Sequence, residues 1–243
     1  ITMEELIVRS PYSEKVLGSY KKIDRSQVLD AIGTANQLLR DRNRHISKSD
    51  RISLMEELRS LMIKNKDELC SIATNEGGKP WTDSMVEVDR AINGVKIAIE
   101  CLGQMGGEEI PMGTNASSEG RLAYTFLEPV GVVSAISAFN HPLNLIVHQV
   151  IPAFAVGAPV LVKPASTTPM SCIRFRELMT EAGIPEEWCQ VILTDTKNAE
   201  LLATDERISF LSFIGSAKVG WYLRSKLTAG AACALEHGGA APV

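Results

Sequence analysis

Four short stretches of the sequence carry residue types that can do chemistry. They are "SAFNHPLN" around Asn140, "LVKPASTTP" around Lys163, "FIGSAKVG" from Phe213, and "ALEHGGAAP" around Glu236. An amide N–H can stabilise an oxyanion, and a carboxylate can act as a general base. An ammonium and a glycine-flanked helix start can hold a phosphorylated ligand.

Asn140 and Glu236 are the candidates for catalysis. Asn140 lies just before Pro142 at an expected helix entry, where its amide either donates to an oxyanion or serves only as an N-cap or turn residue. Glu236 leaves an apolar strand, and partial burial would raise its pKa toward the range that a general base needs. Gly238 and Gly239 would leave room beside it. The structural alternative is a simple pair between Glu236 and a lysine.

Lys163 and the glycines after Phe213 are the candidates for binding a nucleotide. Lys163 directly follows an apolar strand, so its ammonium should reach the sheet edge and bond ribose hydroxyls or a phosphate; alternatively it is a surface lysine. Gly215 and Gly220 have the spacing G-x-x-x-x-G, and the amides of Ser216 and Ala217 offer donors at a helix start. Glycines at such turns are also often only steric, and the fuller phosphate-binding fingerprints are absent.

The second half of the chain alternates between two patterns. Five strand-like runs, at 130–138, 159–165, 189–194, 207–215 and 232–236, alternate with helix-like runs at 142–156, 169–183, 197–205 and 216–230. Pro169 suits a first helical turn and Gly183 a helix end. This alternation predicts an α/β fold with a doubly wound, parallel, Rossmann-like sheet. Ligands bind beyond the carboxyl ends of such strands, where all four stretches lie.

The first half is expected to be a helical region followed by a β arm. Apolar residues recur at helical spacing over 27–39, 50–73 and 83–103, with Asp24 or Ser26 capping the first helix, Ser49 capping the second, and "NEGGKP" ending it. The following Gly-, Asn- and Ser-rich stretch and "RLAYTFLEP" predict a protruding hairpin. We therefore divide the chain into a helical part of the cofactor domain (1–108), an arm (109–129) and a nucleotide-binding part (130–243).

Composition excludes several classes of function. The chain of 243 residues has a net charge of −4, which leaves no basic surface for nucleic acid or an acidic membrane. No apolar run is long enough to span a bilayer and no signal peptide is evident, so the expected location is the cytoplasm. The cysteines number five and are scattered, with no metal-ligand spacing, so they are expected to be reduced thiols, and no metal site is expected.

Taken in order, the four stretches resemble the aldehyde dehydrogenase superfamily. Members carry a "W/F-N-x-P-L" turn, a "K-P-A/S" turn, an "F-x-G-S-x-x-x-G" turn and an "E-L-G-G-x-x-P" turn. The resemblance covers nearly the whole chain, because "GGKP" with its flanking helices looks like the N-terminal region of the family. The segment from "EEIPMG" to "LEPVGVV" looks like its oligomerisation arm and first nucleotide-domain strand.

The resemblance implies a role for each residue. Asn140 would be the oxyanion amide, and Glu236 the general base that activates the deacylating water. Lys163 would reach the adenosine ribose of NAD or NADP; Gly215, Ser216 and Gly220 would line the pyrophosphate and nicotinamide side, with Ser166 and Gly238 also at the cofactor site. The implied partners are a small-molecule aldehyde and, in the full-length enzyme, further copies of the chain in a homo-oligomer.

Three departures qualify the resemblance. The family nucleophile lies in a Gly-Gln-x-Cys setting after "E-L-G-G", and no cysteine of this chain has that context, so we expect a cofactor-binding portion without its catalytic domain and inactive alone. Ser166 stands where NAD-preferring members often carry a Glu, so NADP should be tolerated. His237 replaces the family's Leu, and His141 replaces its aromatic residue. These two variants point weakly to small, often anionic, aldehydes.

Two alternatives remain open at the level of sequence. A nucleotide-binding protein that has lost catalysis would keep Lys163 and the Gly215 turn without needing Glu236. An acylating relative that uses coenzyme A would transfer the acyl group instead of hydrolysing it, but Glu236, which the hydrolysing members need, counts against that relative.

Overall fold

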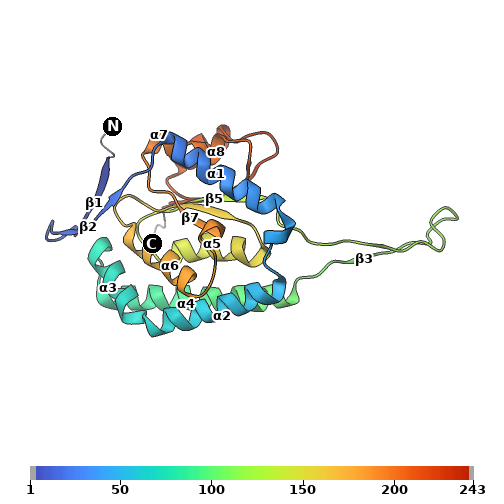
Figure 1. The fold of residues 1–243 in the computed structure, drawn as a ribbon, viewed down its shortest axis with the longest axis horizontal. Coiled ribbons are helices and arrows are strands. Elements are labelled where there is room, and N and C mark those ends of the chain that lie inside the picture. Colours follow the sequence, from blue (N-terminus) through green and yellow to red (C-terminus); the bar gives the residue numbers. More distant parts are fainter. Residues whose placement is uncertain (1–3, 241–243) are drawn as a thin grey trace.

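A five-stranded parallel sheet forms the centre of the computed structural model, which describes residues 4–240 (Figure 1). The strand order is β7-β6-β5-β8-β9, so the chain starts in the middle of the sheet, builds one side and then returns to build the other. This topology confirms the predicted doubly wound sheet. The strands are β5 (Val132–Ile136), β6 (Val160–Lys163), β7 (Cys189–Val191), β8 (Ile208–Gly215) and β9 (Ala232–His237).

The register aligns the ends of the strands. Ile136, the last residue of β5, pairs with Lys163 of β6 on one side and with Phe213 of β8 on the other. Gly215 at the end of β8 pairs with His237 at the end of β9. Because the strands are parallel, the segments that follow them emerge at one edge of the sheet.

Helices cover both faces of the sheet. One face carries α5 and α6, over which α2, α3 and α4 form a further layer, whereas α1, α7 and α8 lie against the other face and α9 packs beside β8 and β9 (Figure 1). The helices are α1 (Arg25–Arg40), α2 (Lys48–Lys64), α3 (Lys66–Gly77), α4 (Trp81–Gln104), α5 (Asn144–Val156), α6 (Met170–Glu181), α7 (Thr196–Ala199), α8 (Leu201–Thr204) and α9 (Ala217–Ser225), with short 3₁₀ turns at Arg42–Arg44 and Glu186–Trp188.

The largest apolar core joins the N-terminal helices to the sheet. It includes Leu58 of α2, Val88 of α4, Phe154 of α5 and Val162 of β6, all of them fully buried. A second core lies under α1 on the opposite face and contains Ile32 and Leu161. The helical region and the sheet therefore share one continuous interior.

The structure corrects four details of the predicted helices. The expected second helix is two helices, because the chain turns at Asn65, which ends α2 and precedes α3. Its N-cap is Ser47, whose hydroxyl accepts from the amide of Asp50 at 3.1 Å, and not Ser49. Pro169 is the N-cap of α6 instead of lying in its first turn, and the helix-like run at 197–205 forms the two short helices α7 and α8.

Two other predicted helix ends are confirmed, the start of α1 and the glycine-rich end of α3. Asp24 caps α1 in a reciprocal capping box, in which its side chain accepts from the amide of Gln27 at 3.0 Å. Gly78 ends α3 with φ of 66°, a left-handed conformation that glycine adopts without strain. An antiparallel hairpin of β1 (Glu5–Arg9) and β2 (Val16–Lys21) precedes α1 and was not predicted.

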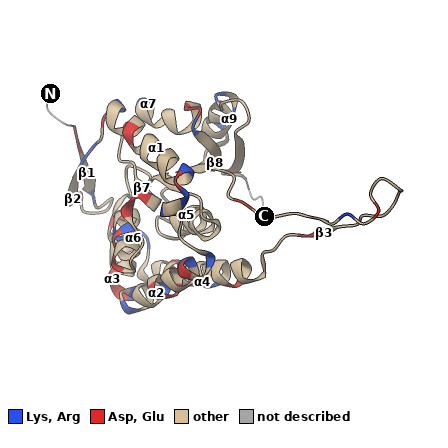
Figure 2. Ribbon diagram, turned by 45° about the vertical axis from the view of Figure 1, so that its right-hand side comes forward, with Lys and Arg blue, Asp and Glu red and all other residues tan. Residues whose placement is uncertain are grey.

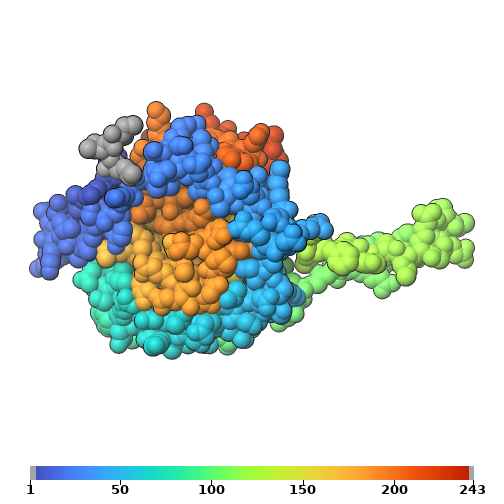
Figure 3. All heavy atoms as spheres, in the orientation of Figure 1, coloured from blue at the N-terminus to red at the C-terminus, as the bar shows by residue number. Residues whose placement is uncertain are grey.

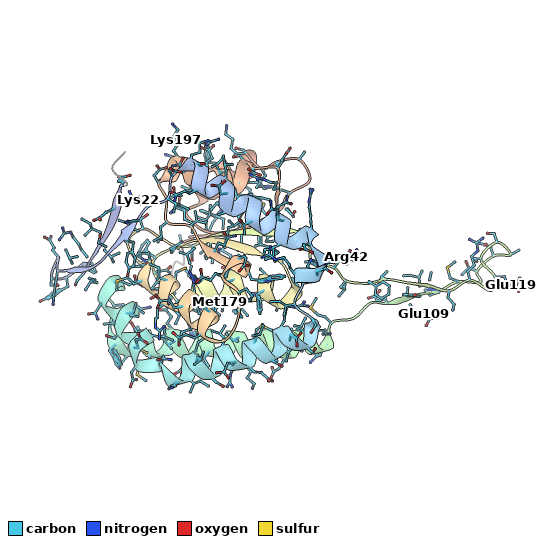
Figure 4. The ribbon with its side chains drawn as sticks, in the orientation of Figure 1. Lys22, Arg42, Glu109, Glu119, Met179 and Lys197 are labelled. Atoms are coloured by element: carbon cyan, nitrogen blue, oxygen red, sulfur yellow. The ribbon has the colours of Figure 1, made fainter. Side chains whose placement is uncertain are left out.

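The predicted arm is present as a long hairpin that projects far from the body (Figures 1 and 3). Its paired residues are β3 (Glu109–Ile110) and β4 (Ala123–Tyr124), and Glu119 lies near its tip (Figure 4). The arm exposes large apolar side chains, namely Ile110, Met112, Leu122, Tyr124, Phe126 and Leu127. An isolated hairpin with this much exposed apolar surface is typical of a segment that packs against another chain or domain.

Within residues 4–240, none of the helices has the length and apolar character that crossing a membrane requires.

Candidate functional site

The structure places the predicted site residues at the carboxyl edge of the sheet. Asn140 follows β5, Lys163 ends β6, and Gly215 ends β8. Glu236 is the penultimate residue of β9. The residues divide between the two faces: Lys163 shares the α1 face with Leu161, whereas Glu236 faces α5.

The turn that carries Asn140 is held from below by two charged residues of the N-terminal helical region. The Lys79 ammonium donates to the backbone carbonyl of Asn140 at 3.4 Å and forms an ion pair with the buried Glu87 carboxylate. The other oxygen of Glu87 accepts from the amides of Leu143 and Asn144 at 2.8 and 3.0 Å. Asn140 itself is exposed. The amide is therefore accessible while the backbone beneath it is anchored.

The β6 turn is anchored in a similar way. Glu76 of α3 is 2% exposed and accepts from the amide of Met170 at 2.7 Å, and from the amide and hydroxyl of Ser171 at 2.8 and 2.5 Å. Burial raises the pKa of Glu76 to about 7, with the nearby Glu87 adding to the rise and the hydrogen bonds from Ser171 and Met170 opposing it.

The sequence analysis did not identify these two carboxylates, because its candidate residues were those that follow the strands. One signal was available for Glu87: it lies among Ser84, Val88 and Ala91, at positions that helical spacing assigns to the buried face. A charge in an apolar stripe requires a partner, which here is the start of α5 together with Lys79.

Lys163 lies half-buried at the end of β6, and its ammonium donates to the carbonyl of Pro164 at 3.3 Å. Burial lowers the pKa of Lys163, and the nearby Asp195 carboxylate acts in the opposite direction. Ser166 is exposed in the same loop. The β6 loop also contacts the Asn140 turn, because the Thr168 hydroxyl donates to the carbonyl of Phe139 at 3.5 Å.

The β8 turn presents the N-terminus of α9. Ser216 is the N-cap of α9, and its hydroxyl accepts from the amide of Val219 at 3.4 Å. The amide of Gly238 donates to the carbonyl of Gly215 at 2.9 Å, which joins the ends of β8 and β9. Gly220 is buried against His237, and a Cβ at Gly220 would collide with the imidazole Nε2. The glycine is therefore needed there for close packing.

The exposure of the Glu236 side chain differs from the prediction. Its side chain is exposed, so the described residues do not provide the partial burial that the sequence predicted. It lies over a mainly apolar groove between α4, α5 and β9, which comprises adjoining cavities of about 480 and 320 Å³. The residues shared by both cavities are His148, Pro152, Val156 and Glu236. The structure places no contact between Glu236 and Asn140 within the described residues.

None of the cysteines is placed as a nucleophile. All five are free, and burial raises the pKa of Cys189 to about 12 and the pKa values of Cys70 and Cys172 above the ordinary range. A thiol with a raised pKa stays protonated at neutral pH and is a poor nucleophile. Cys101 lines the apolar groove and Cys233 lies in β9. Residues 4–240 contain no group of three His, Cys, Asp or Glu residues that could hold a metal ion.

The donors at the carboxyl edge fit a phosphorylated dinucleotide. The first amides of α9 point beyond the sheet at the positive end of the helix dipole, as an anion requires. The Lys163 ammonium at the end of β6 and the Ser166 hydroxyl in the following loop supply further donors, on the other side of β5 from β8. A cavity of about 750 Å³ lies at the opposite edge of the sheet, beside Arg40 and Gly131, and is separate from this site.

Comparisons with known proteins find similar sequences and similar folds. The sequence model of the aldehyde dehydrogenase family matches residues 2–243. A 3-sulfolactaldehyde dehydrogenase of Priestia aryabhattai is 33% identical over 93% of this chain and 47% of its own. Aldehyde dehydrogenase 21 of Physcomitrella patens, solved with its reaction product succinate, superposes with a TM-score of 0.93 at 29% identity, over 99% of this chain and 50% of its own.

A third similar protein was solved with a cofactor. The glyceraldehyde-3-phosphate dehydrogenase GapN of Methanocaldococcus jannaschii, complexed with NADP, superposes with a TM-score of 0.89 at 30% identity, over 98% of this chain and 52% of its own. The chain spans about half the length of the curated relatives it matches.

Proposed function

The chain belongs to the aldehyde dehydrogenase family, and from this premise we propose that it is the cofactor-binding portion of an enzyme that oxidises an aldehyde to a carboxylic acid with NAD or NADP. The observation that carries the proposal is the arrangement of Asn140, Lys163, the Gly215–Ser216 turn and Glu236 at one edge of one sheet. We retain the division into a helical part, an arm and a nucleotide-binding part as a proposal about organisation.

In the proposed enzyme the residues of this chain hold ligands and move one proton. The amides at the start of α9 bind the pyrophosphate, while Lys163 and Ser166 bind the adenosine ribose. A bound NAD(P) would supply the acceptor for a hydride from the substrate. The Asn140 amide donates a hydrogen bond to the oxyanion that forms when a thiolate attacks the aldehyde. Glu236 then accepts a proton from the water that releases the acid.

The thiol itself is proposed to lie in the part of the enzyme that this chain does not span. This fits the raised pKa values of three of the cysteines and the span of about half of each curated relative. The apolar groove beneath Glu236 is the proposed contact for that part. Packing there would also bury Glu236, as a general base for this step requires.

We further propose that the arm assembles the full-length enzyme into a homo-oligomer. Its exposed apolar residues, which include the edge-to-face pair of Tyr124 and Phe126 at 5.2 Å between ring centroids, provide a surface for a second copy. The free cysteines are typical of a reducing compartment, which supports the cytoplasm.

The experiment that tests the proposed function compares this chain with the full-length protein. Calorimetry should detect binding of NAD or NADP to both, while reduced cofactor should accumulate only when the full-length protein receives a panel of small anionic and neutral aldehydes. Binding without oxidation by the full-length protein would favour a nucleotide-binding protein that has lost catalysis. Oxidation by this chain alone, abolished by changing one of its own cysteines, would overturn the assignment of the thiol.

A further inference from the structure

Lys79 and Glu87 form an ion pair beneath the exposed Asn140 turn. The Glu87 side chain is fully buried and the Lys79 side chain is 14% exposed. Both residues come from the N-terminal helical region: Glu87 lies in α4, and Lys79 lies in the connection between α3 and α4. The pair therefore links this region to a turn that follows the first strand of the sheet.

The two oxygens of Glu87 have separate partners. Oε1 accepts from the amides of Leu143 and Asn144, which begin α5, and Oε2 pairs with Lys79. The carboxylate thus satisfies amides that have no partner within the helix and fixes where α5 starts. Because Asn140 lies a few residues before that start, the position of α5 limits where the turn can lie.

Lys79 adds a direct contact to the turn. Its ammonium donates to the backbone carbonyl of Asn140 at 3.4 Å, so the same cation touches Glu87 and the residue that carries the exposed amide. His141, the next residue, has its Nδ1 at 3.8 Å from Oε2 of Glu87. The backbone of the turn is therefore fixed from inside the protein.

A comparison with Glu76 separates positioning from simple charge neutralisation. Glu76 is also buried and also accepts from the first amides of a helix, α6, but it forms no ion pair with any residue of the described chain. The start of a helix therefore holds a buried glutamate side chain without a cation in this protein. The lysine at Glu87 is additional, and its further contact is with Asn140.

We propose that Lys79 and Glu87 are positioning residues for the proposed oxidation: they hold the Asn140 turn so that its amide meets the oxyanion. The inference rests on the proposed function, because it concerns the same site. Neither residue touches the substrate. Their effect reaches the reaction through Asn140, so removing them should lower the rate of the chemical step and leave cofactor binding intact.

The test is a double-mutant cycle in the full-length protein, with kcat and the Kd for NAD(P) measured for wild type, K79M, N140A and the double variant. A misplaced catalytic group costs up to about 100-fold in rate, so K79M should lower kcat by about 10- to 100-fold, with little change in cofactor Kd. In the N140A background the same substitution should change kcat by less than about threefold, because the group it positions is already absent. A purely structural lysine would give the same factor in both backgrounds.

The matched control is K66M, which removes the other ion pair between the α3 region and α4, that of Lys66 with Asp89 at 2.6 Å. More than a quarter of each of these two side chains is exposed to solvent, so the pair contributes little. The kcat of K66M should therefore stay within about twofold of wild type. If K79M does not fold, K79Q carries the same test, since its uncharged and shorter side chain removes the ion pair with Glu87 and cannot bridge Glu87 and Asn140 as the lysine does.

The outcomes distinguish the two proposals. An active wild type whose kcat is unchanged by K79M, or falls equally in both backgrounds, overturns the positioning role and leaves the proposed function standing. A full-length wild type that binds NAD(P) but oxidises no aldehyde overturns the proposed function, and with it this inference.

Discussion

The two proposed catalytic residues, Asn140 and Glu236, sit in very different surroundings. The Asn140 turn is anchored by a buried carboxylate and an ammonium from the helical region, and α5 begins directly behind it. Glu236 lies on the edge strand β9, exposed above an apolar groove. This chain therefore holds the oxyanion side of the proposed site in place by itself, whereas the general base depends on a further surface to cover it.

The comparison also explains why the helical region belongs to the site. Figure 2 places charged residues along α2, α3 and α4, and most of them lie on the outer side of this layer. Glu76 and Glu87 are the exceptions: both are buried, and each caps one of the two helices that follow the first strands of the sheet. The helical layer thus positions two site turns and does more than cover the sheet.

The largest predicted effect comes from removing the anchor of the Asn140 turn. E87A leaves Lys79 without its partner and two helix amides unsatisfied, so the free energy of unfolding should fall by about 3–5 kcal/mol. The matched substitution D89A, also on α4, removes an exposed pair and should cost less than about 1 kcal/mol. Urea denaturation of both variants of this chain measures the difference, and equal losses would remove the contrast between anchored and exposed sites.

The second anchor should make stability depend on pH. The pKa of Glu76 lies at about 7 in the folded chain against 4.5 for an ordinary glutamate, so the folded state binds more protons than the unfolded state between these values. The contribution of Glu76 to the unfolding free energy should therefore be fully present below about pH 4.5 and fall by up to about 3 kcal/mol as the pH rises past 7. E76Q cannot titrate at this position. The fall should be absent from E76Q, and identical pH profiles for the two proteins would contradict the assignment.

At the end of β9, Gly220 packs closely against His237. The centroid of the His237 ring lies 6.3 Å from that of Phe213 and 5.1 Å from that of Trp221. G220A should destabilise the chain by about 1–3 kcal/mol through overpacking. The double variant G220A/H237A should recover most of that loss, because the colliding ring is gone. Thermal melts measure both, and a G220A variant more stable than wild type would show that the ring moves aside freely.

The smallest predicted effect concerns the choice of cofactor. Ser166 is exposed at the β6 turn, and S166E would place a carboxylate where it repels the 2′-phosphate of NADP and accepts from the ribose hydroxyls of NAD. At an exposed site the effect should be about 1 kcal/mol, or roughly fivefold in the ratio of the two dissociation constants. Titration of S166E with each cofactor measures the ratio, and an unchanged ratio would mean that Ser166 is not the selector.

Most of the sheet could be predicted from the sequence because short apolar, strand-like runs alternate with helical patterns over residues 130–236. The break at Asn65 could not, since apolar residues continue at helical spacing across it from Leu58 to Leu69. The Pro242 of the motif "EHGGAAP" lies outside the described residues.

The site was predictable where residue types follow strand ends, as at Asn140 and Lys163. It was not predictable where the role of a residue depends on its burial, as at Glu76 and Glu87. A carboxylate anchors a turn only when the tertiary fold brings the start of a helix to it. For the same reason the exposure of Glu236 was missed: the residues beside an edge strand depend on what packs there.

The most direct test of the central claim is stopped-flow formation of reduced cofactor by the full-length protein carrying E236Q. If Glu236 activates the deacylating water, this variant should retain a rapid first turnover while its steady-state rate falls by about 100-fold or more. A steady-state rate equal to that of wild type would contradict the role assigned to Glu236 and the proposed mechanism with it.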